Sequence, residues 1–171
     1  MRIVGGTWAG RDLYSPRDFR VRPTAEHVRA RWMALLAGDL PGASCIDLFA
    51  GTGALGLEAL SRGALRCDFV ETRPTSLTAL KSNVTALKVR DRTRIFRKDA
   101  LPFAGALPTD AYDVAFVDPP YESRMLDRVI DHWLESGFAR VLSVEHARRH
   151  VLPRGDVTER FDDTLVTIYR R

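Results

Sequence analysis

The chain has 171 residues, 45% of them hydrophobic, and a formal net charge of +4. This length and composition fit a single globular domain with a buried core, and no apolar run approaches the ~20 residues needed to cross a bilayer. The first residues lack the apolar core of a signal peptide, so we expect a mature, cytoplasmic protein that does not associate with membranes. We also expect a monomer.

Basic charge is concentrated near the N-terminus. Residues 1–31 hold seven arginines against three acidic residues, an excess of four that equals the excess of the whole chain. A basic patch at one end indicates a polyanionic partner such as nucleic acid. The alternative is a solubilising face in a chain that uses arginine in place of lysine throughout.

The N-terminal elements are short. Residues 2–5 and 11–14 predict a small β-hairpin around a glycine-rich turn, and residues 15–23, with two prolines, predict a loop. Thr24 is placed to cap a helix that runs to about Ala37, where apolar residues recur at helical spacing. We expect residues 1–22 to form a basic extension of a single domain that spans residues 1–171.

From residue 44 onwards, predicted strands alternate with predicted helices. The expected strands are 44–49, 67–71, 93–97, 112–117 and 140–145, and the expected helices are 54–61, 74–88 and 123–135. Two further strands, 158–162 and 165–170, follow without a helix between them, so one of them is expected to run antiparallel. This order predicts an α/β Rossmann-like fold, with a seven-stranded, mostly parallel sheet and helices on both faces.

A glycine-rich turn follows the first strand of this alternation. It has the spacing Gly51-x-Gly53-x-x-Gly56, and Glu71 ends the next strand about 20 residues later, as in dinucleotide-binding folds. The glycines let a ligand approach backbone N–H groups, and the acid can accept hydrogen bonds from ribose hydroxyls. The alternative is that the glycines serve only tight packing between strand and helix.

Asp47 favours S-adenosylmethionine over a nicotinamide dinucleotide as the ligand of this turn. A carboxylate four residues before the turn repels a pyrophosphate, whereas S-adenosylmethionine carries an ammonium and a sulfonium and no phosphate. Asp99 ends the third strand and is expected to reach the adenine amino group, with helix capping as the alternative. The residues expected to contact the cofactor here are Asp47, Phe49, Ala50, Gly51, Thr52, Gly53, Glu71, Asp99 and Ala100.

Asp118-Pro119-Pro120-Tyr121 follows the fourth strand and is the predicted catalytic loop. An exocyclic amine of a nucleobase is a poor nucleophile, because its lone pair is delocalised into the ring. Hydrogen bonds from its two N–H groups to the Asp118 carboxylate and the Pro119 carbonyl free that lone pair to attack a sulfonium methyl group. The prolines hold these acceptors in place, and Tyr121 offers a face for a flipped base. The alternative is a plain turn at the end of a strand.

Two other kinds of site receive less support. Cys45 and Cys67 lie in or beside apolar runs and are expected to be reduced core thiols, not the nucleophile of a cytosine-C5 methyltransferase. Glu145, His146 and His150 are conceivable metal ligands. The strand predicted at this point does not supply the spacing that would bring them together, so we expect no metal.

The short C-terminal part favours RNA over DNA as the substrate. Only about 50 residues follow Tyr121, and the fold needs most of them. Sequence-specific DNA amino-methyltransferases usually add a sizeable target-recognition region, for which this chain has no room.

Five motifs are spread along the chain: Arg2-Ile3-Val4-Gly5-Gly6 with Trp8 and Gly10-Arg11, then Arg22-Pro23-Thr24, then the run from Asp47 to Ala59, then Asp118-Pro119-Pro120-Tyr121, and finally Asp163-Thr164 with Tyr169. In these motifs the chain resembles, nearly from end to end, the RsmD-type 16S ribosomal RNA guanine-N2 methyltransferases, which have the class I methyltransferase fold.

This resemblance implies transfer of a methyl group from S-adenosylmethionine to one guanine of the small-subunit rRNA. It also implies that Arg22, Pro23 and Thr24 lie near the cofactor. The basic N-terminal extension would bind rRNA, and its candidate residues are Arg2, Trp8, Arg11, Arg17 and Arg20.

The chain departs from the family pattern in one place. Family members often carry Arg-Glu and then Phe-Asn in the first helix, where this chain has Arg29-Ala30 and Trp32-Met33. The alternatives to guanine-N2 methylation are an adenine-N6 or cytosine-N4 nucleic-acid methyltransferase, since the same loop serves all three amines. A non-catalytic RNA-binding assembly factor is a third reading, which the intact set of acids disfavours.

Overall fold

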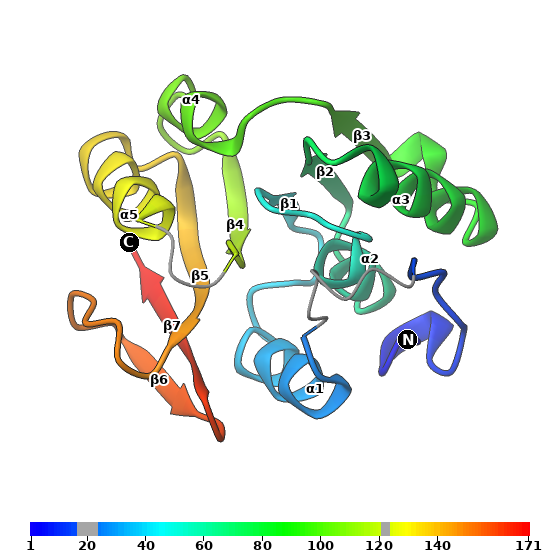
Figure 1. Ribbon diagram of the computed structural model, residues 1–171, viewed down its shortest axis with the longest axis horizontal. Helices are drawn as coiled ribbons and strands as arrows, with labels where there is room; N and C mark the ends of the chain where they lie inside the picture. Colours follow the sequence, from blue (N-terminus) through cyan, green and yellow to red (C-terminus); the bar gives the residue numbers. More distant parts are fainter. Residues whose placement is uncertain (17–23, 121–123) are drawn as a thin grey trace.

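The computed structural model describes residues 1–16, 24–120 and 124–171 (Figure 1). A seven-stranded sheet has the order β3-β2-β1-β4-β5-β7-β6, in which β1 to β5 are parallel and β7 runs antiparallel to both β5 and β6. The predicted fold is therefore confirmed. The strands are β1 (Ser44–Asp47), β2 (Arg66–Val70), β3 (Thr93–Phe96), β4 (Tyr112–Val117), β5 (Ala139–Ala147), β6 (Val157–Arg160) and β7 (Thr164–Arg170).

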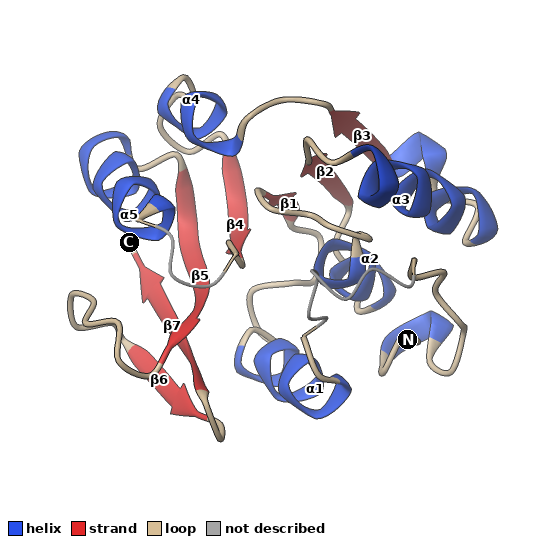
Figure 2. Ribbon diagram, viewed as in Figure 1, coloured by secondary structure: helices blue, strands red, loops and turns tan. Residues whose placement is uncertain are grey.

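Helices cover both faces of the sheet (Figure 2). The helices α1 (Glu26–Leu35), α2 (Ala54–Ser61) and α3 (Pro74–Ala86) share one apolar core with the sheet, and α4 (Ala100–Gly105) and α5 (Met125–Ser136) share the other. The short helix α4 was not among the expected elements. No helix in the described part of the chain is long and apolar enough to cross a membrane.

The predicted N-terminal hairpin is smaller than expected. Arg2 and Asp12 form one antiparallel bridge, and a 3₁₀ turn at Gly6–Trp8 lies between the two segments. The strands do not extend further because the backbone of this segment pairs with α2 instead: the Glu58 carboxylate accepts the N–H groups of Val4 and Gly5 at 2.9 and 2.7 Å. Residues 1–14 are thus packed onto the main domain.

The prediction that Thr24 caps the first helix is wrong. Ala25 occupies the N-cap position of α1 without a side-chain cap, and the helix ends at Leu35. The Thr24 hydroxyl is turned away from the helix backbone and hydrogen-bonds to two carboxylates of the sheet edge, as described below.

Strand β5 is longer than predicted. It continues to Ala147 because β7 pairs with it over seven registers, from Val141↔Arg170 to Ala147↔Thr164. The register of β4 with β5 ends at Val117↔Val144. Asp118 and Glu145 therefore follow directly after the last paired positions of two neighbouring parallel strands.

Candidate active site

A cleft of about 500 Å³ lies at the carboxyl ends of β1 to β4. This is the edge where parallel α/β sheets bind ligands, because the loops that leave successive strands diverge there. The cleft brings together most of the described residues that the sequence singled out. They are Thr24, Asp47, Phe49, Ala50, Gly51, Thr52, Glu71, Asp99, Ala100, Asp118, Pro119 and Pro120.

The glycine turn owes its residues to two different constraints. Gly53, at the N-cap of α2, has a φ of +84°, and a Cβ atom there would lie 2.4 Å from Leu80 Cδ1. Gly56 lies within α2, where a Cβ atom would come within 2.4 Å of the Phe69 ring. Turn geometry thus requires Gly53, whereas Gly56 serves the helix–strand packing that we considered as the alternative.

Glu71 is fixed at the cleft by backbone donors. Its Oε2 accepts the Gly51 N–H at 2.8 Å, and its Oε1 accepts the N–H groups of Thr72 and Arg73 at 2.7 and 2.8 Å. A carboxylate held by three N–H groups cannot rotate freely. It presents a preset acceptor to a ligand in the cleft.

Asp47 is buried and only half satisfied. Its Oδ2 accepts the Gly56 N–H at 3.2 Å, and its Oδ1 has no hydrogen-bond partner among the described residues. Burial raises the pKa of Asp47 to about 7, against the opposing effect of the Gly56 N–H. A buried carboxylate oxygen that lines a cleft and lacks a donor suits a cationic N–H group, such as the ammonium of an amino acid.

Asp99 caps a helix, which is the role that we considered as the alternative to a contact with the adenine. Its Oδ1 accepts the N–H of Leu101 at 3.0 Å, so it caps α4. The residue also lines the cleft beside Ala100, and a contact with a ligand in the cleft remains a prediction.

Thr24 joins two carboxylates, one directly after the end of β4 and one within β5. Its Oγ1 lies 2.8 Å from Asp118 Oδ2 and 3.1 Å from Glu145 Oε2. The hydroxyl has a single proton, so it donates to one carboxylate at a time. Desolvation and the nearby charge of Glu145 raise the pKa of Asp118 well above its usual range, although the Thr24 hydrogen bond opposes them.

Glu145 was not predicted as a member of this site, and its sequence context indicated at most a metal ligand. It is buried, and Thr164 Oγ1 lies 3.0 Å from its Oε1. One signal could have found it, because an acid at the end of a strand that neighbours the Asp118 strand reaches the same edge of the sheet. Among the described residues, no group of three or more histidine, cysteine or acidic side chains is arranged to hold a metal ion.

A second cavity, which we call the chamber, lies on the other side of the Asp118 loop. Its volume is about 520 Å³, and among the described residues it shares only Asp118, Pro119 and Pro120 with the cleft. The chamber is bounded mainly by the start of α5 and the end of β5 with the loop that follows it. Its other lining residues are Arg124, Leu126, Asp127, Glu145, His146, Ala147, Arg149, His150 and Val151.

The N-terminal arginines are less available to bind a polyanion than the charge count suggested. Arg29 is fully buried and pairs with the buried Glu58, and the exposed Arg2 and Arg31 pair with Glu26 and Glu159. A run of charges in the sequence does not show which side chains a helix turns inward. The prediction of a basic surface is therefore wrong for Arg29.

The remaining candidate residues have mixed outcomes. Arg11 is exposed and donates to the Ala86 carbonyl at 3.3 Å, whereas Trp8 packs against the core with Arg92 5.8 Å from its ring centre. Cys45 and Cys67 are buried free thiols, as predicted. Five predicted site residues lie outside the described part of the chain: Arg17, Arg20, Arg22, Pro23 and Tyr121.

Comparison with known proteins points to one family. A protein-family model described as "Conserved hypothetical protein 95" matches residues 1–157. The ribosomal RNA small subunit methyltransferase D of Escherichia coli (strain K12) is 36% identical over 138 residues, which cover 81% of this chain and 69% of that protein. YlbH of Bacillus subtilis (strain 168) is 32% identical and covers 100% and 99% of the two chains. The solved structure of yhhF from Escherichia coli matches with a TM-score of 0.87 at 31% identity, covering 100% and 97%.

Proposed function

This chain belongs to the family described as Conserved hypothetical protein 95, that of the ribosomal RNA small subunit methyltransferase D proteins, and we propose that it methylates the exocyclic N2 amine of a guanine in 16S rRNA with S-adenosylmethionine as donor. One observation carries the proposal: Asp118-Pro119-Pro120 separates two cavities at the carboxyl end of β4, so that one can hold a donor and the other an acceptor.

The cleft fits S-adenosylmethionine by the chemistry of its polar groups. The unpaired Asp47 Oδ1 suits the ammonium, and the preset Glu71 carboxylate suits the ribose hydroxyls. Asp99 and Ala100 line the cleft and contact the adenine, and Thr24 lies beside Asp118. Arg22 and Pro23, which fall outside the described residues, bind the cofactor together with Thr24. When bound, the cofactor supplies an electrophilic methyl group on a sulfonium.

The Asp118 loop binds and activates the amine. The Asp118 carboxylate and the Pro119 carbonyl accept its two N–H groups and localise the nitrogen lone pair toward the methyl group. With the cofactor held by Asp47 and Glu71, methyl transfer would form the new N–C bond as the S–C bond breaks, and the electron pair of the broken bond would stay on sulfur. Asp118 takes the proton that the nitrogen loses, which the raised pKa of this carboxyl favours. Tyr121 stacks on the base.

The partner is the rRNA, alone or in the small subunit. Arg2, Trp8 and Arg11 contact it, together with Arg17 and Arg20, as part of one methyltransferase domain over residues 1–171. Arg2 and Arg11 are exposed, which supports this role. The protein acts as a cytoplasmic monomer that does not associate with membranes.

Methyl transfer from labelled S-adenosylmethionine to 16S rRNA and to small subunits, followed by nucleoside analysis, tests the proposal. We expect N2-methylguanosine at one mapped position. N6-methyladenosine or N4-methylcytidine without N2-methylguanosine would reassign the base, and no transfer to any of these RNAs, despite cofactor binding, would favour a non-catalytic assembly factor.

A further inference from the structure

We propose that the chamber holds the target guanine and that Glu145 is a specificity-determining residue, whose carboxylate accepts the guanine N1–H. The inference rests on the proposed function, because it assigns a role within that same reaction. It concerns the choice of base, which the Asp118 loop cannot make, since guanine, adenine and cytosine all present an amine with two N–H groups.

The position of the chamber fits an acceptor base. It touches the catalytic loop from the side opposite the cleft, and its volume of about 520 Å³ lies in the usual range of small-molecule sites, ~300–1,000 Å³. Its walls combine apolar side chains, such as Leu126 and Val151, with polar groups on β5. A flipped base needs both kinds of contact, because its faces are apolar and its edge is polar.

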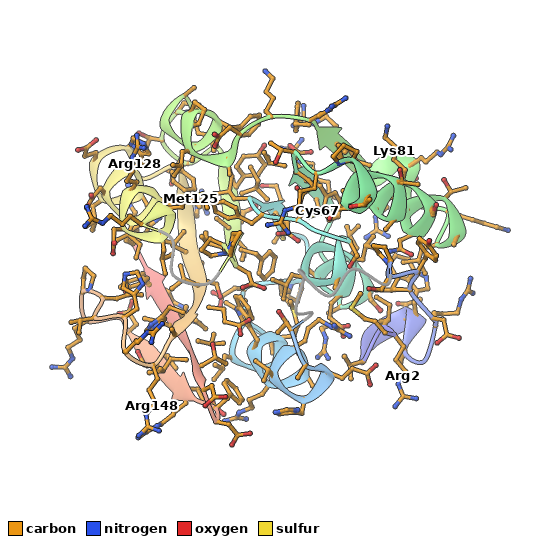
Figure 3. All side chains as sticks on the ribbon, viewed as in Figure 1. Arg2, Cys67, Lys81, Met125, Arg128 and Arg148 are labelled. Atoms are coloured by element: carbon orange, nitrogen blue, oxygen red, sulfur yellow. The ribbon has the colours of Figure 1, made fainter. Side chains whose placement is uncertain are left out.

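The chamber also has basic residues nearby for an RNA backbone. Arg124 and Arg149 line it, and both are exposed at the surface. Arg148, in the loop after β5, lies on the side of the molecule opposite to Arg2 (Figure 3). Phosphates that flank a flipped base can therefore meet positive charge beside the chamber as well as at the N-terminal segment.

The hydrogen-bonding edge of each base decides the specificity. In guanine, the ring nitrogen N1 beside the amine carries a proton, so two neighbouring donors face the protein. In adenine and cytosine, the ring nitrogen beside the amine carries a lone pair. Two neighbouring carboxylates match the two donors of guanine and repel the lone pair of the other bases. A buried acceptor that is left without a donor also costs binding free energy.

Asp118 and Glu145 form such a pair of neighbouring acceptors. Both lie within 3.1 Å of Thr24 Oγ1, and both line the chamber. Each follows the last residue at which β4 and β5 pair with each other, so the pairing of the two strands fixes the distance between the two carboxylates. With the amine held by Asp118, the neighbouring N1–H is directed toward the next carboxylate along the edge, that of Glu145.

The contacts of Glu145 suggest a conservative variant that keeps the size of the side chain and changes its charge and hydrogen-bonding character. Thr164 Oγ1 lies 3.0 Å from both Glu145 Oε1 and the His146 carbonyl oxygen, and when it donates to Glu145 it favours an oxygen at Oε1. In Glu145→Gln, the amide nitrogen then takes the place of Oε2, next to Thr24 and Asp118. This nitrogen donates, so it opposes a guanine N1–H and accepts a base whose N1 carries a lone pair.

The test uses 2-aminopurine, which keeps the N2 amine but has a lone pair on N1. RNA substrates with guanine or 2-aminopurine at the mapped target position are made by ligation, and single-turnover methyl transfer is measured for each. We expect the wild-type protein to prefer guanine by about 10- to 100-fold. Glu145→Gln should lower the guanine rate and remove most of this preference, with unchanged S-adenosylmethionine affinity.

Two controls make the result decisive. Glu135→Gln removes an exposed carboxylate on α5 and should leave both rates unchanged. The ratio of the two rates within one protein sample does not depend on the folded fraction, so partial misfolding of Glu145→Gln cannot mimic a lost preference. An unchanged ratio in Glu145→Gln, or no preference in the wild-type protein, overturns the role of Glu145 but leaves guanine methylation standing. A wild-type protein that methylates no guanine overturns the proposed function and this inference with it.

Discussion

The cleft and the chamber meet at Asp118 but are built in different ways. In the cleft, acidic side chains are held by backbone donors close in sequence: Glu71 binds the N–H of Gly51 and Asp47 binds that of Gly56, 20 and nine residues away. At the chamber, the two carboxylates Asp118 and Glu145 are joined by Thr24, a residue of the cleft, across 94 and 121 residues. The cleft is thus set by a local motif, and the chamber by how distant strands and helices come together.

This difference separates cofactor binding from substrate choice. A local motif can be kept whole while the elements around the chamber change, so one donor site can serve many acceptors. Variants on the two sides should accordingly differ in which step they impair. The largest loss of activity is expected for a residue that borders both the cleft and the chamber. The smallest effect is expected where only the protonation state of a side chain changes.

Replacing Asp118, which borders both cavities, should have the largest effect. Asp118→Ala removes an acceptor of the amine and of its proton, so we expect methyl transfer to fall about 100- to 10,000-fold. Affinity for S-adenosylmethionine, measured by calorimetry, should stay within a few-fold of wild type. Asp131→Ala, at an exposed position on α5, serves as the control. Wild-type turnover in Asp118→Ala would show that the catalytic group lies elsewhere.

A substitution in the cleft alone should weaken cofactor binding without slowing the methyl-transfer step. Asp47→Asn keeps an acceptor for the Gly56 N–H but loses the charge that faces the cofactor ammonium. A hydrogen bond to a charged group contributes about 1.5–3 kcal/mol, so we expect the Kd for S-adenosylmethionine to rise about 10- to 100-fold. The rate at saturating cofactor should change little. A large loss of rate with unchanged affinity would place Asp47 in the chemical step.

The protonation of Asp47 should give the smallest effect. Its pKa in the folded protein, about 7, lies above the ordinary 3.8, so the folded state binds this proton more readily than the unfolded state does. Without cofactor, the stability that Asp47 contributes is present below about pH 4 and is lost as the pH rises to about 7. Between pH 5 and 8, the Tm of the wild-type protein should fall a few degrees more than that of Asp47→Asn. Parallel curves would show that Asp47 is ionised throughout.

The residues of the cleft were easier to predict from the sequence than those of the chamber, because the cleft is built from a local motif and the chamber from distant segments. The order of the strands and the residues of the glycine turn follow from hydrophobic alternation and from spacing over a few residues, and the structure has both. Thr24 was assigned to a helix cap, and Glu145 to no more than a conceivable metal site. Their true contact depends on the pairing of β4 with β5 and on where α1 begins, which local patterns do not encode.

Charge was the least predictable property. Arg29 contributes to the N-terminal excess of the sequence, but α1 turns it into the core beside Glu58. Removing one partner of a buried ion pair typically costs about 3–5 kcal/mol, so this arginine serves stability and not surface charge. A count of charges by segment cannot make that distinction.

The narrow boundary between the two cavities has a kinetic consequence. Because Asp118, Pro119 and Pro120 are the only described residues that line both cavities, we expect that neither occupant has to pass through the site of the other to enter or leave. Either substrate can then add first to form the ternary complex, and either product can depart first. Initial-rate plots should intersect, and the demethylated cofactor should compete with its parent without competing with RNA.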